Sequence, residues 1–86
     1  MTKNEKILLE IILFKNDRGI KFYDLCEALE YLGFQKRIKG DHFIYYREGI
    51  EEIINIQPDK NMAKAYQVKQ VRNILLKYNM VGGIYE

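Results

Sequence analysis

The sequence predicts an α+β fold in the order α-α-β-β-β-α, with one small antiparallel sheet. Apolar residues recur at spacings of three and four in three segments, which is the period of one helix face. Between the second and third of these segments, short apolar stretches are separated by glycine-containing turns, which is typical of an antiparallel meander. The expected helices are 3–15, 22–32 and 66–78, and the expected strands are 34–39, 42–47 and 50–56.

The first predicted helix has a recognisable start. Thr2 and Glu5 have the spacing of a capping box, in which a hydroxyl and a carboxylate satisfy backbone N–H groups at the start of a helix. Leu9 and Leu13 make this helix apolar on more than one side. We therefore expect it to be buried on two sides or to offer one face to a partner.

The other two predicted helices have clearer ends and faces. Gly33 follows the second helix, at the position where a helix end favours a left-handed residue. An apolar stripe indicates one buried face on the last helix. The polar residues beside that stripe, which include Gln67 and Arg72, are expected to face water. Residues 80–86 are expected to form a flexible tail.

The composition predicts one folded domain, 1–86, with 48% hydrophobic and 30% charged residues. No apolar run is long enough to span a bilayer, and the first residues lack the pattern of a signal peptide, so the cytoplasm is the expected location. Cys26 is the only cysteine, which excludes an intramolecular disulfide and a thiolate zinc site. Neither a metal nor a small-molecule cofactor is expected.

Positive charge is concentrated in two segments of the chain. Residues 35–47 carry four basic residues against one acidic residue, and residues 59–77 carry five against one. Both segments also contain aromatic residues, and basic patches interleaved with aromatics favour a surface for a polyanion. The alternative is a set of solvated lysines on ordinary helix and strand faces.

His42 is the only histidine, and it lies directly after a turn that begins at Gly40. Histidine is the side chain best suited to proton transfer near neutral pH. Cleavage of an RNA backbone needs a base for the 2′-hydroxyl, an acid for the leaving oxygen and cations for the charge on phosphorus. Lys36, Arg37 and Lys39 lie nearby as cations. Gly40 would let a phosphate approach the backbone. The structural alternative is an ordinary strand histidine beside a glycine turn.

Several short motifs follow one another in a fixed order from the second predicted helix onward. They are Asp24-Leu25, Leu29 through Phe34, Gly40-Asp41-His42, Ile54-Asn55-Ile56-Gln57, Lys64 through Arg72, and Ile74-Leu75. In this order and spacing they resemble the HicA family of bacterial toxins, small RNA-cleaving proteins of type II toxin–antitoxin systems. The resemblance covers about two-thirds of the chain.

The resemblance implies a double-stranded-RNA-binding-like domain, in which helices pack on one face of a three-stranded antiparallel sheet. Residues 20–79 would form the HicA-like core. The chain is most similar to the branch of the family with an extra N-terminal helix, which would lie within residues 1–19.

The resemblance also implies a function and its residues. The family uses the histidine of a glycine-serine-histidine motif in catalysis, and this histidine maps to His42. The implied protein is an mRNA interferase, a metal-independent endoribonuclease that acts on mRNA and is neutralised by a HicB-like antitoxin. Contacts to RNA are expected from the turn glycine and from basic residues that should flank the sheet edge: Lys36, Arg37, Lys39, Gly40, Lys64 and Arg72.

The chain departs from the family pattern beside the histidine. Asp41 stands where serine is common, and Phe43 stands where many relatives have a second histidine. Asp41 could orient the imidazole and raise its pKa, or it could repel phosphate. The second proton-transfer group stays open between Lys39 and Tyr45, although Tyr45 is expected on the opposite strand face from His42.

Two other functions remain as alternatives. One is a binding module of the same fold that holds RNA or an antitoxin without cleaving RNA. The other is a purely structural partner of an antitoxin-like protein. Incubating RNA with the purified protein separates cleavage from both alternatives.

Overall fold

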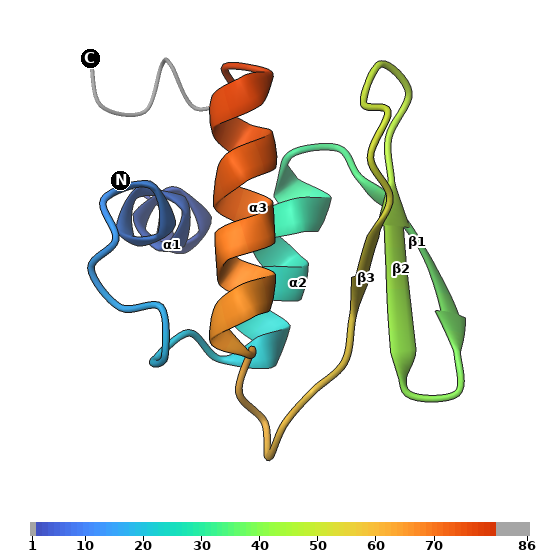
Figure 1. Cartoon of the computed structure of the whole chain (residues 1–86), viewed down its shortest axis with the longest axis horizontal. Helices are drawn as coiled ribbons and strands as arrows, with labels where there is room; N and C mark the ends of the chain where they lie inside the picture. Colours follow the sequence, from blue (N-terminus) through green and yellow to red (C-terminus); the bar gives the residue numbers. More distant parts are fainter. Residues whose placement is uncertain (1, 81–86) are drawn as a thin grey trace.

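The computed structural model describes residues 2–80 and confirms the predicted α+β fold and its element order. It contains three helices, and three strands lie between the second helix and the third (Figure 1). The elements are α1 (Lys3–Ile12), α2 (Phe22–Tyr31), β1 (Gln35–Lys39), β2 (His42–Tyr46), β3 (Ile54–Ile56) and α3 (Ala65–Lys77). Within residues 2–80 no helix has both the length and the apolar character needed to cross a membrane.

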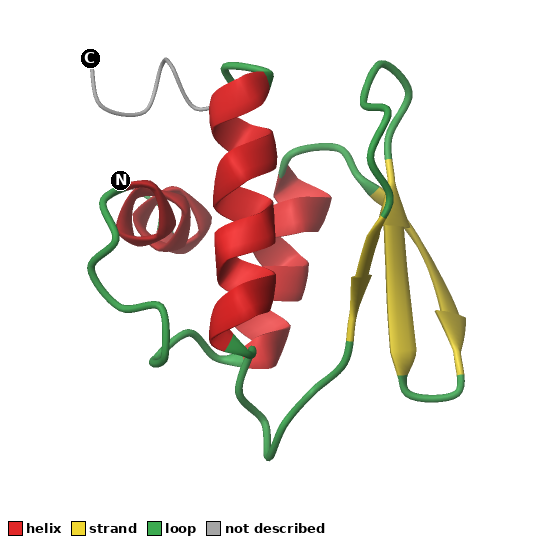
Figure 2. Cartoon of the chain, in the orientation of Figure 1, coloured by secondary structure: helices red, strands yellow, loops and turns green. Residues whose placement is uncertain are grey.

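The three strands form an antiparallel sheet in the order β1-β2-β3, so β2 is central and β1 and β3 are its edges. Helices α2 and α3 lie on one side of this sheet, and α1 lies beyond them on the side away from the sheet (Figure 2). Helix α1 packs on both α2 and α3. The other face of the sheet is left open by the described residues.

The core lies between these layers. Each helix contributes its apolar stripe, and the sheet contributes the side chains that point toward the helices. On β2 and β3 those side chains include Tyr45, Ile54 and Ile56, which are fully buried. This decides which face of β2 meets the helices, because His42 and Tyr46 are exposed on the opposite face. The sequence pattern alone left this orientation open.

Helix α1 ends at Ile12 instead of Lys15, so the predicted end is wrong by three residues. The chain closes the helix with Phe14 in a left-handed conformation, at φ 58°. The N–H of Phe14 donates to the carbonyl of Ile11, and the N–H of Lys15 donates to that of Glu10, which is the Schellman pattern of a helix end. A residue other than glycine is strained in the left-handed conformation. A tertiary contact of Phe14, described below, offsets that strain.

The other helix ends use the same pattern with residues that suit it. Gly33 has φ 90° after α2 and confirms the predicted helix end. Asn79 has φ 49° after α3, and the N–H of Met80 donates to the carbonyl of Leu75. Met80 is partly buried against the core. The remainder of the predicted tail, residues 81–86, lies outside the described residues.

Strand β3 starts at Ile54, so the predicted strand over residues 50–56 is too long. The reason is that the residues before Ile54 form hydrogen bonds with the end of α3 and not with β2. The N–H of Glu51 donates to the Tyr78 hydroxyl at 3.2 Å, so it is held by the end of α3. The carboxylate of Glu52 accepts hydrogen bonds from Tyr78 at 2.6 Å and from Lys77 at 2.8 Å. These contacts tie the segment to α3 instead of to β2.

Glu52 makes this contact sensitive to acid. Hydrogen bonds from Lys77 and then from Tyr78 lower the pKa of Glu52 to about 2 from its ordinary value of 4.5. The folded state therefore gains stability from this carboxylate above about pH 4.5, and the gain disappears as the pH falls toward 2. We expect Glu52→Gln to lower the midpoint of thermal unfolding at pH 6, with a gap to the wild type that closes between pH 4.5 and pH 2.

Circular dichroism melts over this pH range measure the gap. Glu48→Gln is the matched control, because Glu48 is an exposed carboxylate in the same connection between β2 and β3. A gap that stays constant from pH 6 to pH 2 would show that Glu52 does not act through its charge.

Candidate functional site

The β1–β2 hairpin carries the candidate site, and its turn has only two residues, Gly40 and Asp41. Gly40 has φ 62°, a left-handed value, while Asp41 has an ordinary negative φ. Glycine at the first central position is the signature of the type II′ hairpin turn, whose twist matches the flanking strands. A Cβ added at Gly40 would meet no atom within 4 Å, so glycine serves the backbone conformation and the turn is open to a large ligand.

His42 is the first residue of β2 and the cross-strand partner of Lys39. Its side chain is 48% exposed, on the face of the sheet away from the helices. The ring Nδ1 lies 3.1 Å from Oδ1 of Asn55, a residue of β3 on the same face. With the amide oriented this way, Nδ1 carries the proton and donates to Asn55. The neutral ring then keeps a free lone pair on Nε2, where it can accept a proton.

Asp41 lies on the other side of the imidazole. Its Oδ1 is 3.8 Å from Nε2 of His42, which is longer than a hydrogen bond. Its Oδ2 accepts a hydrogen bond from the side-chain amide of Gln57 at 2.8 Å. This bond is the main reason that the pKa of Asp41 lies below its ordinary value, and the nearby His42 and Lys64 lower it further by charge. Asp41 is therefore a negative charge held beside Nε2 of His42.

The position of Asp41 is set from the start of α3. Gln67 is fully buried, and its side-chain amide donates to the backbone carbonyl of Gln57 at 3.2 Å. The side-chain oxygen of Gln67 accepts from the backbone N–H of Lys64 at 3.1 Å. The prediction that Gln67 faces water is thus wrong. A continuous set of hydrogen bonds links the first turn of α3 to the turn beside His42.

Two of the predicted basic residues share the open sheet face with His42. Lys39 lies opposite His42, and Arg37 lies opposite Ile44 one step further along the ladder. Both are exposed, and no described residue forms a salt bridge with either. These two cations are available to a ligand that approaches the exposed ring of His42.

Lys36 and Lys64 are placed differently from these two cations. Lys36 lies opposite Tyr45 and so points to the helix side, where its Nζ is 3.3 Å from a carboxylate oxygen of Glu30. Lys64 precedes α3, and its charge acts on Asp41. The structure therefore brings Lys64 toward the turn at Gly40 and separates Lys36 from the open face.

Arg72 is not a surface residue, and the prediction that it faces water is wrong. Its burial argues against the RNA contact that the sequence predicted for it. Its side chain is 1% exposed. Its Nε donates to the carbonyl of Ile11 at 2.8 Å, and both of its terminal nitrogens donate to Oδ2 of Asp17. The centre of the Phe14 ring lies 3.6 Å from the guanidinium carbon, and this contact helps to hold Phe14 in its left-handed conformation. Arg72 joins α3 to α1 and the loop after it.

Tyr45 does not serve as the second proton-transfer group. It is fully buried, as expected on the opposite strand face from His42, and its hydroxyl donates to Glu30 at 3.0 Å. Burial raises the pKa of Tyr45 far above its ordinary value of 10. Burial also raises the pKa of Cys26, which is consistent with a core thiol and not a nucleophile. Of the two candidates from the sequence, only Lys39 lies on the face of His42.

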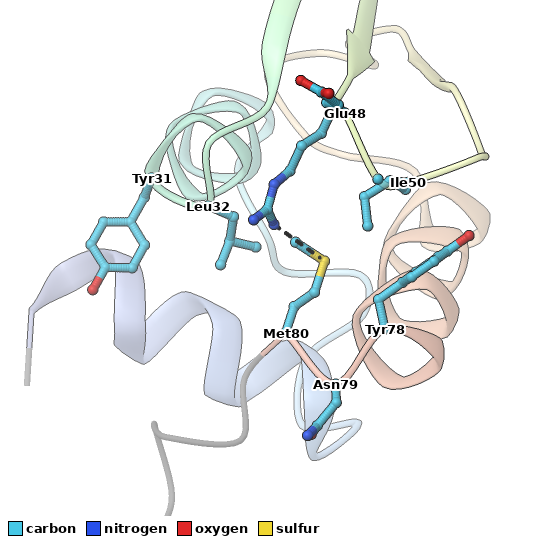
Figure 3. A pocket seen from close by; sticks show the side chains of 9 residues that line it. Tyr31, Leu32, Glu48, Ile50, Tyr78, Asn79 and Met80 are labelled. Atoms are coloured by element: carbon cyan, nitrogen blue, oxygen red, sulfur yellow. Dashed lines mark hydrogen bonds between the residues drawn. The ribbon is translucent and has the colours of Figure 1, made fainter.

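A hollow of about 580 Å³ lies away from His42, between the ends of α2 and α3 and the β2–β3 connection (Figure 3). Leu32, Ile50 and Met80 line it, and the guanidinium of Arg47 lies 4.0 Å from the sulfur of Met80. None of the predicted site residues lines this hollow. The candidate site is instead an open surface, which suits a long substrate better than a small molecule.

Three polar residues complete the site and were not assigned a role from the sequence. Asn55 orients His42, Gln57 fixes Asp41, and Gln67 fixes Gln57. All three lie within the motifs quoted above, but a polar residue in a motif does not reveal its partner. The strand alternation places Asn55 between buried Ile54 and Ile56, and this was the available signal that Asn55 faces outward with His42.

Among residues 2–80, no group of three His, Cys, Asp or Glu side chains gathers closely enough to hold a metal ion. No protein-family model matches the chain, and comparisons with characterised proteins and with solved structures found no match either.

Proposed function

We propose that this protein is an RNA-cleaving toxin, an mRNA interferase of a type II toxin–antitoxin system, with His42 as its catalytic residue. The observation that carries the proposal is the state of His42. Its ring is exposed and held through Nδ1 by Asn55, which leaves Nε2 free beside a glycine turn. Arg37 and Lys39 lie on the same face, and neither forms a salt bridge within residues 2–80. A histidine that served only to pack would be buried instead.

The architecture supports the proposal at the level of the fold. The segment α2-β1-β2-β3-α3 has the order of a double-stranded-RNA-binding-like domain, and both of its helices lie on one side of the sheet. Helix α1 is then an addition that packs behind α2 and α3, away from the sheet. The open sheet face stays free for a large ligand.

In the proposed reaction, Nε2 of His42 takes the proton of an RNA 2′-hydroxyl. The 2′-oxygen attacks the neighbouring phosphorus, and the bond from phosphorus to the 5′-oxygen breaks. The products are a 2′,3′-cyclic phosphate and a 5′-hydroxyl, and the leaving 5′-oxygen takes its proton from Lys39 or from water. Lys39 is the cross-strand partner of His42, so it would stabilise the charge that builds on the phosphoryl oxygens. No metal takes part in this scheme.

The remaining residues of the proposed RNA surface have separate roles. Arg37 extends the positive face along β1, and Lys64 adds positive charge on the other side of the turn. Gly40 leaves the turn open to a phosphate. Lys36 would reach RNA only at the β1 edge, because its ammonium is paired with Glu30. A HicB-like antitoxin would neutralise the protein by covering His42 and this surface.

The alternative is a module of the same fold that binds RNA or an antitoxin without cleaving RNA. One observation favours it, namely the carboxylate of Asp41 at 3.8 Å from the reactive nitrogen. A phosphate that approaches Nε2 would meet this negative charge. The alternative differs from the main proposal only in catalysis, so a cleavage assay decides between them.

The deciding experiment incubates the purified full chain with a defined single-stranded RNA in the presence of a metal chelator. We expect cleavage, with products that carry 2′,3′-cyclic phosphate and 5′-hydroxyl ends. RNA that is bound but stays intact would select the non-catalytic module. RNA that is neither bound nor cleaved would exclude both and leave the structural partner of an antitoxin.

Asp41 gives a second test. The sequence left two roles open for it, orienting the imidazole or repelling phosphate, and the geometry favours the second. Asn55 already orients the ring through Nδ1, so Asp41 is not needed to hold it. We therefore expect Asp41→Asn to raise RNA affinity and cleavage by roughly two- to fivefold, because it removes one exposed charge of the wrong sign. The asparagine can still accept the hydrogen bond from Gln57.

Binding and initial cleavage rates of the variant are measured at low salt and near neutral pH. Asp59→Asn removes an equal charge from the loop before α3 and is the matched control. A lower rate in Asp41→Asn, with unchanged affinity, would show that Asp41 acts on the imidazole instead of repelling phosphate.

A further inference from the structure

The outer edge of β1 is an unpaired strand edge. Strand β1 pairs with β2 on one side only, and no segment within residues 2–80 pairs with its other side. All five of its residues, Gln35–Lys39, are exposed. An edge of this kind presents free backbone N–H and C=O groups and is a template for an added strand unless something covers it.

The register identifies which backbone groups are free. Lys39 and His42 flank a two-residue turn, and residues at this position normally exchange both of their backbone hydrogen bonds. Pairs alternate along an antiparallel ladder, so the next residues bonded to β2 are Arg37 and Gln35. The N–H and C=O groups of Lys36 and Ile38 therefore point away from β2, toward the open edge.

The side chains beside this edge differ between the two faces of the sheet. On the open face, Arg37 and Lys39 are exposed and have no acidic partner among the described residues. On the helix side, Ile38 is 51% exposed and Tyr23 is 56% exposed. Ile38 is the cross-strand partner of Phe43, and the Tyr23 ring packs edge-on against the Phe43 ring. Ile38, Tyr23 and Phe43 form an apolar ledge along the edge of β1.

We propose that β1 binds an extended segment of a partner protein as a fourth strand, and that this segment alternates acidic and apolar residues. Its acidic side chains would lie on the open face beside Arg37 and Lys39, and its apolar side chains would cover the apolar ledge. Side chains of a strand alternate between faces, so one segment meets both requirements. A second copy of β1 does not fit, because it would bring Arg37 and Lys39 against their own copies.

The position of the edge links this binding mode to the candidate site. Lys39 is both an edge residue and the cross-strand partner of His42. A bound acidic strand would neutralise the two free cations of the open face and exclude RNA from them. Strand addition itself does not need RNA cleavage, and only this inhibitory consequence rests on the proposed function.

The test uses the isotope-labelled full chain and a synthetic nine-residue peptide that alternates valine with glutamate and is blocked at both ends. We expect binding to slow hydrogen exchange at the amides of Lys36 and Ile38, and to leave Arg37, already bonded to β2, unchanged. The same peptide with N-methyl groups on the residues that face β1 should not bind. A peptide with lysine in place of glutamate should not bind either.

A pair of chain variants tests the charge contribution. Arg37→Gln with Lys39→Gln removes two exposed cations from β1, and we expect roughly fivefold or greater loss of peptide affinity. Lys6→Gln with Lys69→Gln removes two exposed cations elsewhere and is the matched control. The proposal is overturned if the N-methylated peptide binds as well as the unmodified one, if protection appears away from β1, or if no binding occurs at millimolar peptide. An inactive protein that still binds the peptide would reject only the proposed function.

Discussion

His42→Ala is expected to reduce RNA cleavage by about 10²–10⁴-fold, the usual contribution of a general acid–base group. The fold should survive, because the side chain is half exposed and its hydrogen bond is to Asn55, which is also exposed. RNA affinity should change little, since affinity for a polyanion comes mainly from contacts between cations and phosphates. The change therefore separates catalysis from both stability and binding.

The measurement is the rate of cleavage of a defined RNA at equal concentrations of folded protein, checked by circular dichroism. Tyr46→Ala is the matched control, because Tyr46 lies on the same strand and the same exposed face. Equal rates for wild type and His42→Ala would end the catalytic assignment. A loss of activity in proportion to the loss of folded protein would make His42 a structural residue.

Asn55 provides an independent check on how His42 works. If Asn55 holds the ring through Nδ1, its removal leaves the imidazole present but free to rotate. Activity in Asn55→Ala should then lie between those of the wild type and His42→Ala, with the same RNA affinity. A positioning residue behaves in this way because the reacting group is still there but spends less time in the productive orientation.

The parts of the fold that were predictable depend on local physical chemistry. Apolar spacing located all three helices, Gly33 located the end of α2, and the Gly40-Asp41 pair located the hairpin turn. Each of these signals lies within one turn or one helix face, so the sequence around it carries the information. The same is true of His42, whose place at the start of β2 follows from the turn before it.

The predictions that were wrong concern residues whose partners lie far away along the chain. Residues 50–53 have the composition of a strand, but Glu51 and Glu52 bond to Tyr78 and Lys77 about 26 residues later. Arg72 has the composition of a surface residue, but its partner Asp17 lies 55 positions earlier. The roles of Gln57 and Gln67 are equally non-local. Neither hydrophobic periodicity nor a local motif can predict such pairings.

Arg72 leads to the largest expected effect on stability. Arg72→Ala would leave the carboxylate of Asp17 without its guanidinium and would remove the donor to the Ile11 carbonyl. The other oxygen of Asp17 is already buried without a hydrogen-bond partner in the described structure, so the remaining charge would be poorly compensated. The Phe14 ring would also lose the cation that it covers, and with it a contact that offsets its left-handed backbone.

We therefore expect Arg72→Ala to lower the free energy of unfolding by about 3 kcal/mol, the lower end of the usual effect of removing one partner of a buried ion pair, because the side chain of Asp17 is 29% exposed. Small domains have a total stability of about 5–15 kcal/mol, so this loss would be a large part of the margin of the fold. Arg72→Lys should be less severe, because it keeps a charge near Asp17 but loses the planar fork that also reaches Ile11. Urea unfolding of the variants measures these differences.

The controls separate this structural role from the RNA contact predicted from the sequence. Lys69→Ala removes a positive charge from the exposed side of the same helix and should change stability by less than about 0.5 kcal/mol. Arg72→Met combined with Asp17→Leu removes both charges and should recover much of the stability lost in Arg72→Ala, because no buried charge is left unpaired. This double variant should also keep its RNA affinity. If it is stable but binds RNA more weakly than Lys69→Ala does, Arg72 contributes to the RNA surface despite its burial.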